Sequence, residues 1–198
     1  MFDVEQPITI KLNTPAGEKV VRVRWPSDEE WIERQRKRKV VVKQLGRGMS
    51  ETLVPDSAES DAALLAKIRL DDGGPVDTYE ASIVIDRLSQ ADVDEVEREG
   101  QNVRVKLRTV AGEVTHLLQI PSARDVIEYR RSFARVVDLP YNRQEITINL
   151  APAGQLWGKL AQSTDGYSGA VPIIHQAVAV KAAIDAIEAG LDDGADPN

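Results

Sequence analysis

The chain has 198 residues, of which 42% are hydrophobic, and a net charge of −7 at pH 7. This composition can bury a core, which excludes a disordered protein, and the acidic balance argues against nucleic-acid binding by the chain as a whole. Cysteine is absent, which excludes disulfides, thiolate nucleophiles and cysteine-ligated zinc.

No targeting or membrane segment is predicted. The N-terminal residues MFDVEQPITI lack the basic region and apolar run of a signal peptide. No stretch approaches the roughly 20 apolar residues that a membrane helix needs. We therefore expect a cytoplasmic protein that makes no contact with a membrane.

The first predicted element is a β-hairpin that begins near Ile8. Apolar residues alternate with polar ones along its two strands, as they do in half-buried strands (Ile8, Ile10 and Leu12, then Val21, Val23 and Trp25). Between the strands lies Thr-Pro-Ala-Gly-Glu, where Gly17 suits the positive φ of a hairpin turn.

A helix is predicted directly after this hairpin. Pro26 separates it from the preceding strand. Ser27 is followed three residues later by Glu30, which is the spacing of a capping box. Further along the chain we predict a short strand over 51–54 and helices over 58–69 and 78–89.

The same series of elements then recurs, because residues 10–42 align with residues 105–137 without a gap. Thirteen of these 33 positions are identical, where ordinary composition would give roughly two. In the second helix, apolar residues at helical spacing are expected to face the core (Val126, Tyr129, Phe133 and Val137). We refer to the two halves as the first and second copies.

The remaining predicted elements complete the second copy. Residues 93–97 are predicted to pair with 103–107 across Gly100, and residues 145–150 to form a short strand. Helices are predicted over 154–162 and 172–189, the latter bounded by Pro172 and Gly190, which suit its two ends. Residues 191–198 are predicted to be a frayed, acidic tail.

Together these elements predict an α+β fold built by tandem duplication. Each copy would hold a hairpin, a helix, a short strand and two helices, and the copies would pack about a pseudo-twofold axis. We expect the first repeat unit to span residues 1–92, the second 93–190 and the tail 191–198.

A basic segment over residues 19–47 is the clearest charge feature. It holds ten basic residues against four acidic ones (Lys19, Arg22, Arg24, Arg34, Arg36, Lys37, Arg38, Lys39, Lys43 and Arg47 against Asp28, Glu29, Glu30 and Glu33). Two interpretations are open: a surface for nucleic acid or an acidic partner, or a solvated face whose charges meet acids elsewhere in the molecule.

The alignment places a candidate partner site on the first helix. Arg34 and Arg38 align with Tyr129 and Phe133. Because guanidinium groups are rarely buried without a partner, we expect the arginine face in the first copy to be open to solvent, a partner or a charged neighbour. The candidate partner-binding residues are Trp31, Arg34, Arg36, Lys37 and Arg38. Trp31 has a second interpretation as an ordinary core residue.

The two histidines are the candidates for chemistry. His116 aligns with Val21 on the apolar face of its strand, which favours a core histidine. His175 has Ser163, Asp165 and Ser168 nearby in sequence, so a hydrolase of unknown type is an alternative. No nucleophile elbow supports it.

No catalytic, cofactor or metal site is predicted. The acidic stretches 71–74 and 192–196 lack the ligand spacing of a calcium loop. Gly46-Arg47-Gly48 lacks the rest of a phosphate-binding fingerprint.

The segment Trp25-Pro26-Ser27-Asp28-Glu29-Glu30-Trp31 precedes an Arg/Lys-rich helix and resembles parts of phage tail-morphogenesis proteins. Those proteins include small accessory proteins and tail-assembly chaperones. The resemblance covers residues 8–45 and carries over no functional residue. It implies an accessory or structural role in a virion or phage-derived particle, and so a virion-associated location as an alternative to the cytoplasm.

The leading functional prediction is a non-enzymatic structural or interaction protein. Duplication of a unit doubles a binding surface or builds symmetry into an assembly. We therefore expect self-assembly or a protein partner. The alternatives are a nucleic-acid-binding module that uses residues 19–47, and a hydrolase that uses His175.

Overall fold

The structure is a computed structural model, and it describes residues 1–14, 17–46, 49–53, 57–71 and 77–190. Several sequence predictions fall wholly or partly outside these residues. They concern the tail over 191–198 with its acidic stretch 192–196, most of the acidic stretch 71–74, the glycine segment 46–48 with Arg47 of the basic segment, and the end of the strand predicted over 51–54.

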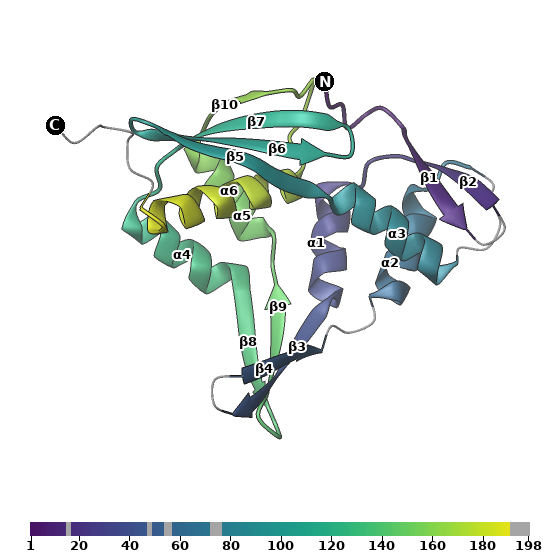
Figure 1. Cartoon of the computed structure of the whole chain (residues 1–198), viewed down its shortest axis with the longest axis horizontal. Helices are drawn as coiled ribbons and strands as arrows, with labels where there is room; N and C mark the ends of the chain where they lie inside the picture. The colour runs from purple at the N-terminus through teal and green to yellow at the C-terminus, as the bar shows by residue number, and fades with distance from the viewer. Residues whose placement is uncertain (15–16, 47–48, 54–56, 72–76, 191–198) are drawn as a thin grey trace. The chain divides into compact units, whose positions relative to one another are not determined.

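The predicted α+β class is confirmed. In the described part of the chain, six helices accompany three antiparallel sheets (Figure 1). The elements of the first half are β1 (Ile8–Thr14), β2 (Gly17–Val23), α1 (Asp28–Lys37), β3 (Lys39–Gly46), β4 (Met49–Leu53), α2 (Ala58–Ile68) and α3 (Thr78–Ser89). Those of the second half are β5 (Ala91–Glu99), β6 (Asn102–Thr109), β7 (Gly112–Gln119), α4 (Ala123–Phe133), β8 (Ala134–Leu139), β9 (Arg143–Ile148), α5 (Ala151–Leu160), β10 (Ala161–Asp165) and α6 (Ile173–Glu188).

The chain forms two compact units, and neither is continuous in sequence. One comprises residues 1–4, 89–130 and 151–198, and the other comprises 5–88 and 131–150. We call them the histidine unit and the arginine unit, after buried residues described below. This division differs from the predicted one at residue 92, because β9 of the second copy pairs with β3 of the first, and β8 pairs with β9.

The core of the arginine unit lies between the β1–β2 hairpin and three helices. The extended chain after α2 continues along β2, where the Leu70 amide donates to the Arg22 carbonyl at 2.9 Å. On α3, Arg87 donates to the Lys11 carbonyl at 3.0 Å. Apolar side chains from all of these elements are buried (among them Leu12, Val23, Trp31, Leu65, Ile68, Ile85 and Leu88).

The arginine unit also holds a four-stranded antiparallel sheet in the order β4-β3-β9-β8. Strand β3 follows directly from the end of α1, and its two neighbours come from different copies. Val41 lies opposite Leu53 of β4 on one side and Glu145 of β9 on the other.

The histidine unit is a four-stranded antiparallel sheet, β10-β7-β6-β5, with α6 packed against β5, β6 and β7 and α5 packed against α6. The predicted pairing across Gly100 is confirmed: Val93 lies opposite Leu107, and Gly100 has φ of 60°. Most residues of α6 are buried, and nearly all of these are alanine or branched aliphatic residues. The helix is therefore apolar over more than one stripe of its surface.

The β1–β2 and β6–β7 hairpins share one register. Ile10 lies opposite Val21 in the first, and Val105 lies opposite His116 in the second. These are the residues that the sequence alignment equates. The turn glycines Gly17 and Gly112 have φ of 119° and 123°, a region that favours glycine. The duplication itself stays a prediction, although the order of elements in the two halves agrees with it.

Three strands of the described structure were not predicted: β3, β8 and β10, the last of which includes the end of the helix predicted over 154–162. Val137 was expected on the core face of a helix, but α4 ends at Phe133 and Val137 lies in β8 with 38% of its surface exposed. The β-branched run that contains it favours a strand, and pairing with β9 stabilises that strand. The single short strand predicted after the first helix of each copy is therefore the second arm of a hairpin: β4 pairs with β3, and β9 pairs with β8.

The β4-β3-β9-β8 sheet also departs from the predicted pseudo-twofold arrangement. A twofold axis through it would bring like strands together, β3 beside β8 or β4 beside β9 of the other copy. Instead β3 pairs with β9, which is the counterpart of β4. The two hairpins are therefore arranged head to tail.

Candidate functional site

The predicted capping box at the start of α1 is confirmed. The Ser27 side chain accepts from the Glu30 amide, and the Glu30 carboxylate accepts from the Ser27 amide at 2.8 Å. Arg24 donates to Glu30 at 2.7 Å, and this hydrogen bond lowers the pKa of that carboxyl group. This cap fixes where α1 begins and so which of its side chains face α2.

Trp31 and Arg34, two of the predicted partner-binding residues, lie in the core of the arginine unit. Trp31 is 2% exposed and packs against Trp25 with ring centroids 6.0 Å apart. The Arg34 guanidinium lies over the Trp31 ring at 5.7 Å, and Arg34 is only 5% exposed. For Trp31, the alternative interpretation as a core residue is the one that the structure supports.

Of the three surroundings expected for the arginine face of α1, a charged neighbour is the one observed at Arg34. Its Nε donates to Asp61 of α2 at 2.6 Å, and the Ser57 hydroxyl donates to the same carboxylate at 3.0 Å. A buried guanidinium requires a counter-ion, and Asp61, which is 0% exposed, supplies it. Nothing in the sequence linked these two residues, because they lie on different helices. Arg38 follows α1 as its C-cap and is half-buried.

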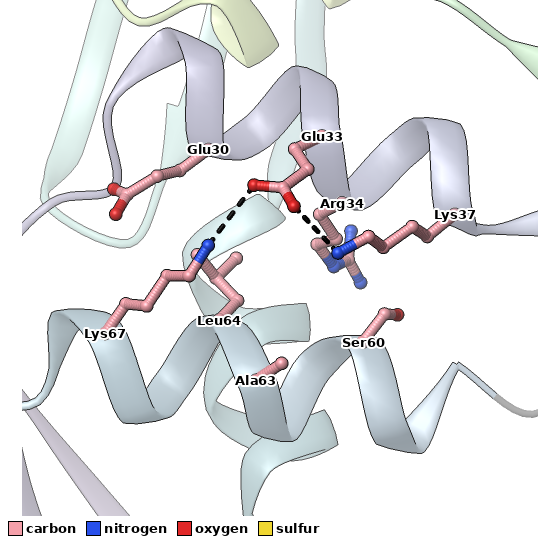
Figure 2. A pocket seen from close by; sticks show the side chains of 8 residues that line it. All are labelled: Glu30, Glu33, Arg34, Lys37, Ser60, Ala63, Leu64 and Lys67. Carbon is pink, nitrogen blue, oxygen red and sulfur yellow. Dashed lines mark hydrogen bonds and ion pairs between the residues drawn. The ribbon is translucent and has the colours of Figure 1, made fainter.

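Arg34 also lines a small cleft between α1 and α2 (Figure 2). Glu33 points into the gap between the helices, where Lys37 donates to it at 2.7 Å and Lys67 at 3.2 Å. The hydrogen bond from Lys37, followed by that from Lys67, lowers the pKa of Glu33. Lys37 and Lys67 thus share one carboxylate at the mouth of the cleft.

Part of the basic segment is neutralised in the same way. Lys19, Arg24, Arg34 and Lys37 pair with acidic residues of the arginine unit (Glu80, Glu30, Asp61 and Glu33). For these four residues, the interpretation as charges that meet acids elsewhere in the molecule is the one observed. Arg36 and Lys37 are exposed, and their role in binding a partner stays a prediction.

Both histidines are fully buried in the histidine unit, which confirms the core position predicted for His116. They belong to one directed hydrogen-bond chain. Trp157 Nε1 donates to His116 Nδ1 at 3.1 Å, and the Tyr167 hydroxyl lies 3.0 Å from His116 Nε2 and 3.1 Å from His175 Nδ1. Because His116 Nδ1 accepts, its Nε2 carries the proton and donates to Tyr167, whose hydroxyl then donates to His175.

These hydrogen bonds require the imidazoles of His116 and His175 to be neutral. Burial lowers the pKa of His116 to about 4 and, with the neighbouring His116, that of His175 to about 3. Burial also raises the pKa of the Tyr167 hydroxyl. The groups are therefore fixed in the protonation states that the hydrogen bonds need.

The residues considered for a hydrolase triad make other contacts. Asp165 accepts from the Gly166 amide at 2.8 Å, and Ser168 donates to the Phe2 carbonyl at 3.2 Å. His175 instead hydrogen-bonds Tyr167 and packs edge-on against Phe2, with ring centroids 5.1 Å apart. Neither the aromatic ring nor the Tyr167 link was predicted.

The most unusual surface is the β4-β3-β9-β8 sheet. β-branched residues form a row across three of its strands: Val40 lies opposite Ile146, which lies opposite Val136. Yet no residue of these four strands whose side chain the structure describes is buried, and Val136 is 52% exposed. The runs Val40-Val41-Val42 and Val136-Val137 are the sequence signal that could have revealed this sheet.

Neither a metal cluster nor a membrane-spanning helix is found in the described ranges. No family model matches the chain, and neither a characterised protein nor a solved structure does so. The function must therefore be inferred from the geometry of the chain itself.

Proposed function

We propose that this chain is a non-enzymatic structural protein that assembles through the β4-β3-β9-β8 sheet. One observation carries the proposal: the sheet carries apolar β-branched residues on both of its faces, and a single molecule buries none of its described side chains. Exposed apolar surface of this kind marks protein interaction sites.

Both faces of the sheet contribute to this surface. Val40, Ile146 and Val136 lie on one face, and Val41 and Val137 lie on the other, because successive residues of a strand alternate. A sheet that is apolar on both faces needs cover on both, and packing against further protein supplies it.

The remaining candidate groups support a structural role. The buried Arg34–Asp61 pair and the His116–Tyr167–His175 hydrogen bonds join side chains inside each unit and fix how it packs. The resemblance of residues 8–45 to phage tail-morphogenesis proteins suggests the setting, which we propose to be a virion or phage-derived particle.

Light scattering after size-exclusion chromatography tests the proposal over about 1 µM to about 1 mM protein. We expect the mass to rise above that of one chain, and an Ile146→Lys substitution, which places a charge in the apolar row, to return it to one chain. A single-chain mass at every concentration would overturn self-assembly. The variant Arg124→Lys, on an exposed helix position, is the matched control.

A further inference from the structure

The uncovered sheet is built from two equivalent hairpins. In the β3–β4 hairpin, Val41 lies opposite Leu53, and in the β8–β9 hairpin Val136 lies opposite Ile146. The sequence alignment equates Val41 with Val136, and the next pairs follow in step, with Val42–Thr52 matched by Val137–Glu145. Strand β8 is thus the counterpart of β3, and β9 is the counterpart of β4.

These hairpins join each other through unlike edges. Strand β3 offers the edge that β4 does not use, and β9 offers the edge that β8 does not use. The contact is therefore heterologous: a β3-type edge meets a β4-type edge. A heterologous contact leaves one copy of each edge unused, whereas a twofold contact would consume two identical edges.

The two unused edges belong to β8 and β4. Neither is paired on its outer side with another strand among the described residues. The outer edge of β8 corresponds to the edge of β3 that binds β9, and the outer edge of β4 corresponds to the edge of β9 that binds β3. The two outer edges of this sheet are therefore of the same two types that pair between β3 and β9 inside the chain.

We propose that β8 of one molecule adds, antiparallel, to β4 of a second copy of this chain and repeats the β3–β9 pairing between molecules. The inference rests on the proposed assembly function and names its contact. Strand addition at an exposed edge is an established mode of protein recognition. Here the partner is a copy of the same chain, because only the repeat makes the two edges complementary.

The internal pairing also fixes the register between molecules. Inside the chain, Val41 lies opposite Glu145 and Val42 lies opposite Gln144. If the counterpart residues pair in the same way, Val136 of one molecule lies opposite Thr52 of the second molecule, and Val137 lies opposite its Glu51. All four of these side chains are exposed in the single molecule.

Charge supports this register. With Val137 opposite Glu51, Arg135 lies diagonal to Glu51 on the same face, since side chains two residues apart share a face. Both residues are exposed, and opposite charges on diagonal positions of neighbouring strands attract. A shift by one residue would place Arg135 and Glu51 on opposite faces.

Repeated head-to-tail pairing extends the sheet by two hairpins per molecule. Such an assembly is a closed ring if the rotation between molecules closes and a helical filament if it does not. In both cases the free edges are removed from solvent and the apolar rows become continuous from one molecule to the next.

Cysteine crosslinking tests the register. Because the chain has no cysteine of its own, only the introduced cysteines can form a disulfide. We would mix a tagged Val137→Cys variant with an untagged Glu51→Cys variant and oxidise the mixture. Opposed residues of antiparallel strands lie within disulfide reach. We expect about tenfold more disulfide-linked heterodimer than from Val136→Cys mixed with Glu51→Cys, in which the two side chains face opposite ways.

Two further variants make the result decisive. The doubly substituted Val41→Cys/Glu145→Cys chain should form the corresponding bond within one molecule, which verifies the internal pairing on which the register depends. The Arg135→Glu substitution should reduce the assembled mass, and Glu51→Arg in the same chain should restore it, because the diagonal pair is rebuilt with reversed signs.

The outcomes separate this inference from the proposed function. An assembled protein that gives no more heterodimer for the in-register pair than for the control overturns the β8–β4 contact and leaves the assembly function standing. A protein of single-chain mass overturns the assembly function. Loss of the internal Val41→Cys/Glu145→Cys bond overturns the sheet order, and the inference with it.

Discussion

At the scale of residues, the two copies solve the same packing problem in different ways. Arg34 on α1 aligns with Tyr129 on α4, and both are buried. The sequence left open whether Arg34 would face solvent, a partner or a charged neighbour. In the first copy, Asp61 neutralises Arg34. When residues 64–68 are aligned with 156–160, the position of Asp61 corresponds to Ala153, which is small and fully buried.

This comparison predicts how the Arg34–Asp61 pair responds to substitution. Asp61→Ala leaves a buried guanidinium without its counter-ion, and we expect it to lower the free energy of unfolding by about 3 kcal/mol. Arg34→Tyr/Asp61→Ala installs the second copy's residues and should recover most of that loss. Urea unfolding measures both, and a double variant less stable than the single one would contradict the comparison.

The buried histidines predict a defined pH dependence. Their pKa values in the folded protein, about 4 for His116 and about 3 for His175, lie below the ordinary value near 6.5. Below pH 6.5 the unfolded chain therefore binds protons that the folded chain does not. The stabilisation by neutral histidines is complete above that pH and is lost as the pH falls towards 4, by about 1.4 kcal/mol per pH unit for each histidine.

Two measurements check this dependence. The chain has only two histidines, so their ring signals are readily assigned by NMR, and we expect neither to titrate above pH 5. The variant His116→Val, which installs the residue of the first copy, should remove about half of the slope of unfolding free energy against pH. A midpoint near 6.5 for either ring would show that the imidazoles are not buried.

At the scale of elements, α1 has a buried face and an exposed basic face, and only the second is available to a partner. Trp31 and Arg34 belong to the core, whereas Arg36 and Lys37 are exposed. A helix with charges opposite its apolar stripe is ordinary in a soluble protein. The role of this face must therefore be tested separately from that of the sheet.

Charge reversal provides that test. We expect Arg36→Glu/Lys37→Glu to leave the assembled mass unchanged. We expect the free energy of unfolding to stay within about 0.5 kcal/mol of that of the parent chain. We also expect the parent chain not to be retained on DNA at low salt, since four of its basic residues are already paired within the arginine unit. Retention that falls steeply with salt and disappears in the variant would instead support the nucleic-acid-binding alternative.

At the scale of the whole molecule, the chain crosses between its two compact units several times. The histidine unit takes Phe2 from the N-terminus, where it pairs with Tyr167, and the arginine unit takes β8 and β9 from the second copy. A cut between the copies therefore separates strands that are paired. This arrangement makes the copies mutually dependent.

Fragment complementation tests this dependence. Residues 1–90 and 91–198, coexpressed as separate chains, should copurify as a one-to-one complex, because β3 still needs β9 and Tyr167 still needs Phe2. Residues 1–90 alone should expose the edge of β3 and aggregate. Two fragments that each remain folded and monomeric would show instead that the copies are independent domains.

The sequence by itself determined the local features, because those depend on neighbours along the chain. Alternation and turn glycines located the β1–β2 and β6–β7 hairpins, and a serine three residues before an acid located the start of α1. The alignment of the copies placed His116 in the core. The same local methods missed β3, β8 and β10, because each continues directly from a helix and has no turn signal before it.

Only the tertiary structure decided the features that depend on distant partners. The burial of Arg34 required Asp61 from another helix, and the state of His116 and His175 required Tyr167 between them. The joining of β3 to β9 depends on which edge of one copy meets which edge of the other. Every strand edge offers backbone N–H and C=O groups, so the residue pattern along one strand does not say which strand takes each edge, and it is this pairing that leaves β8 and β4 open.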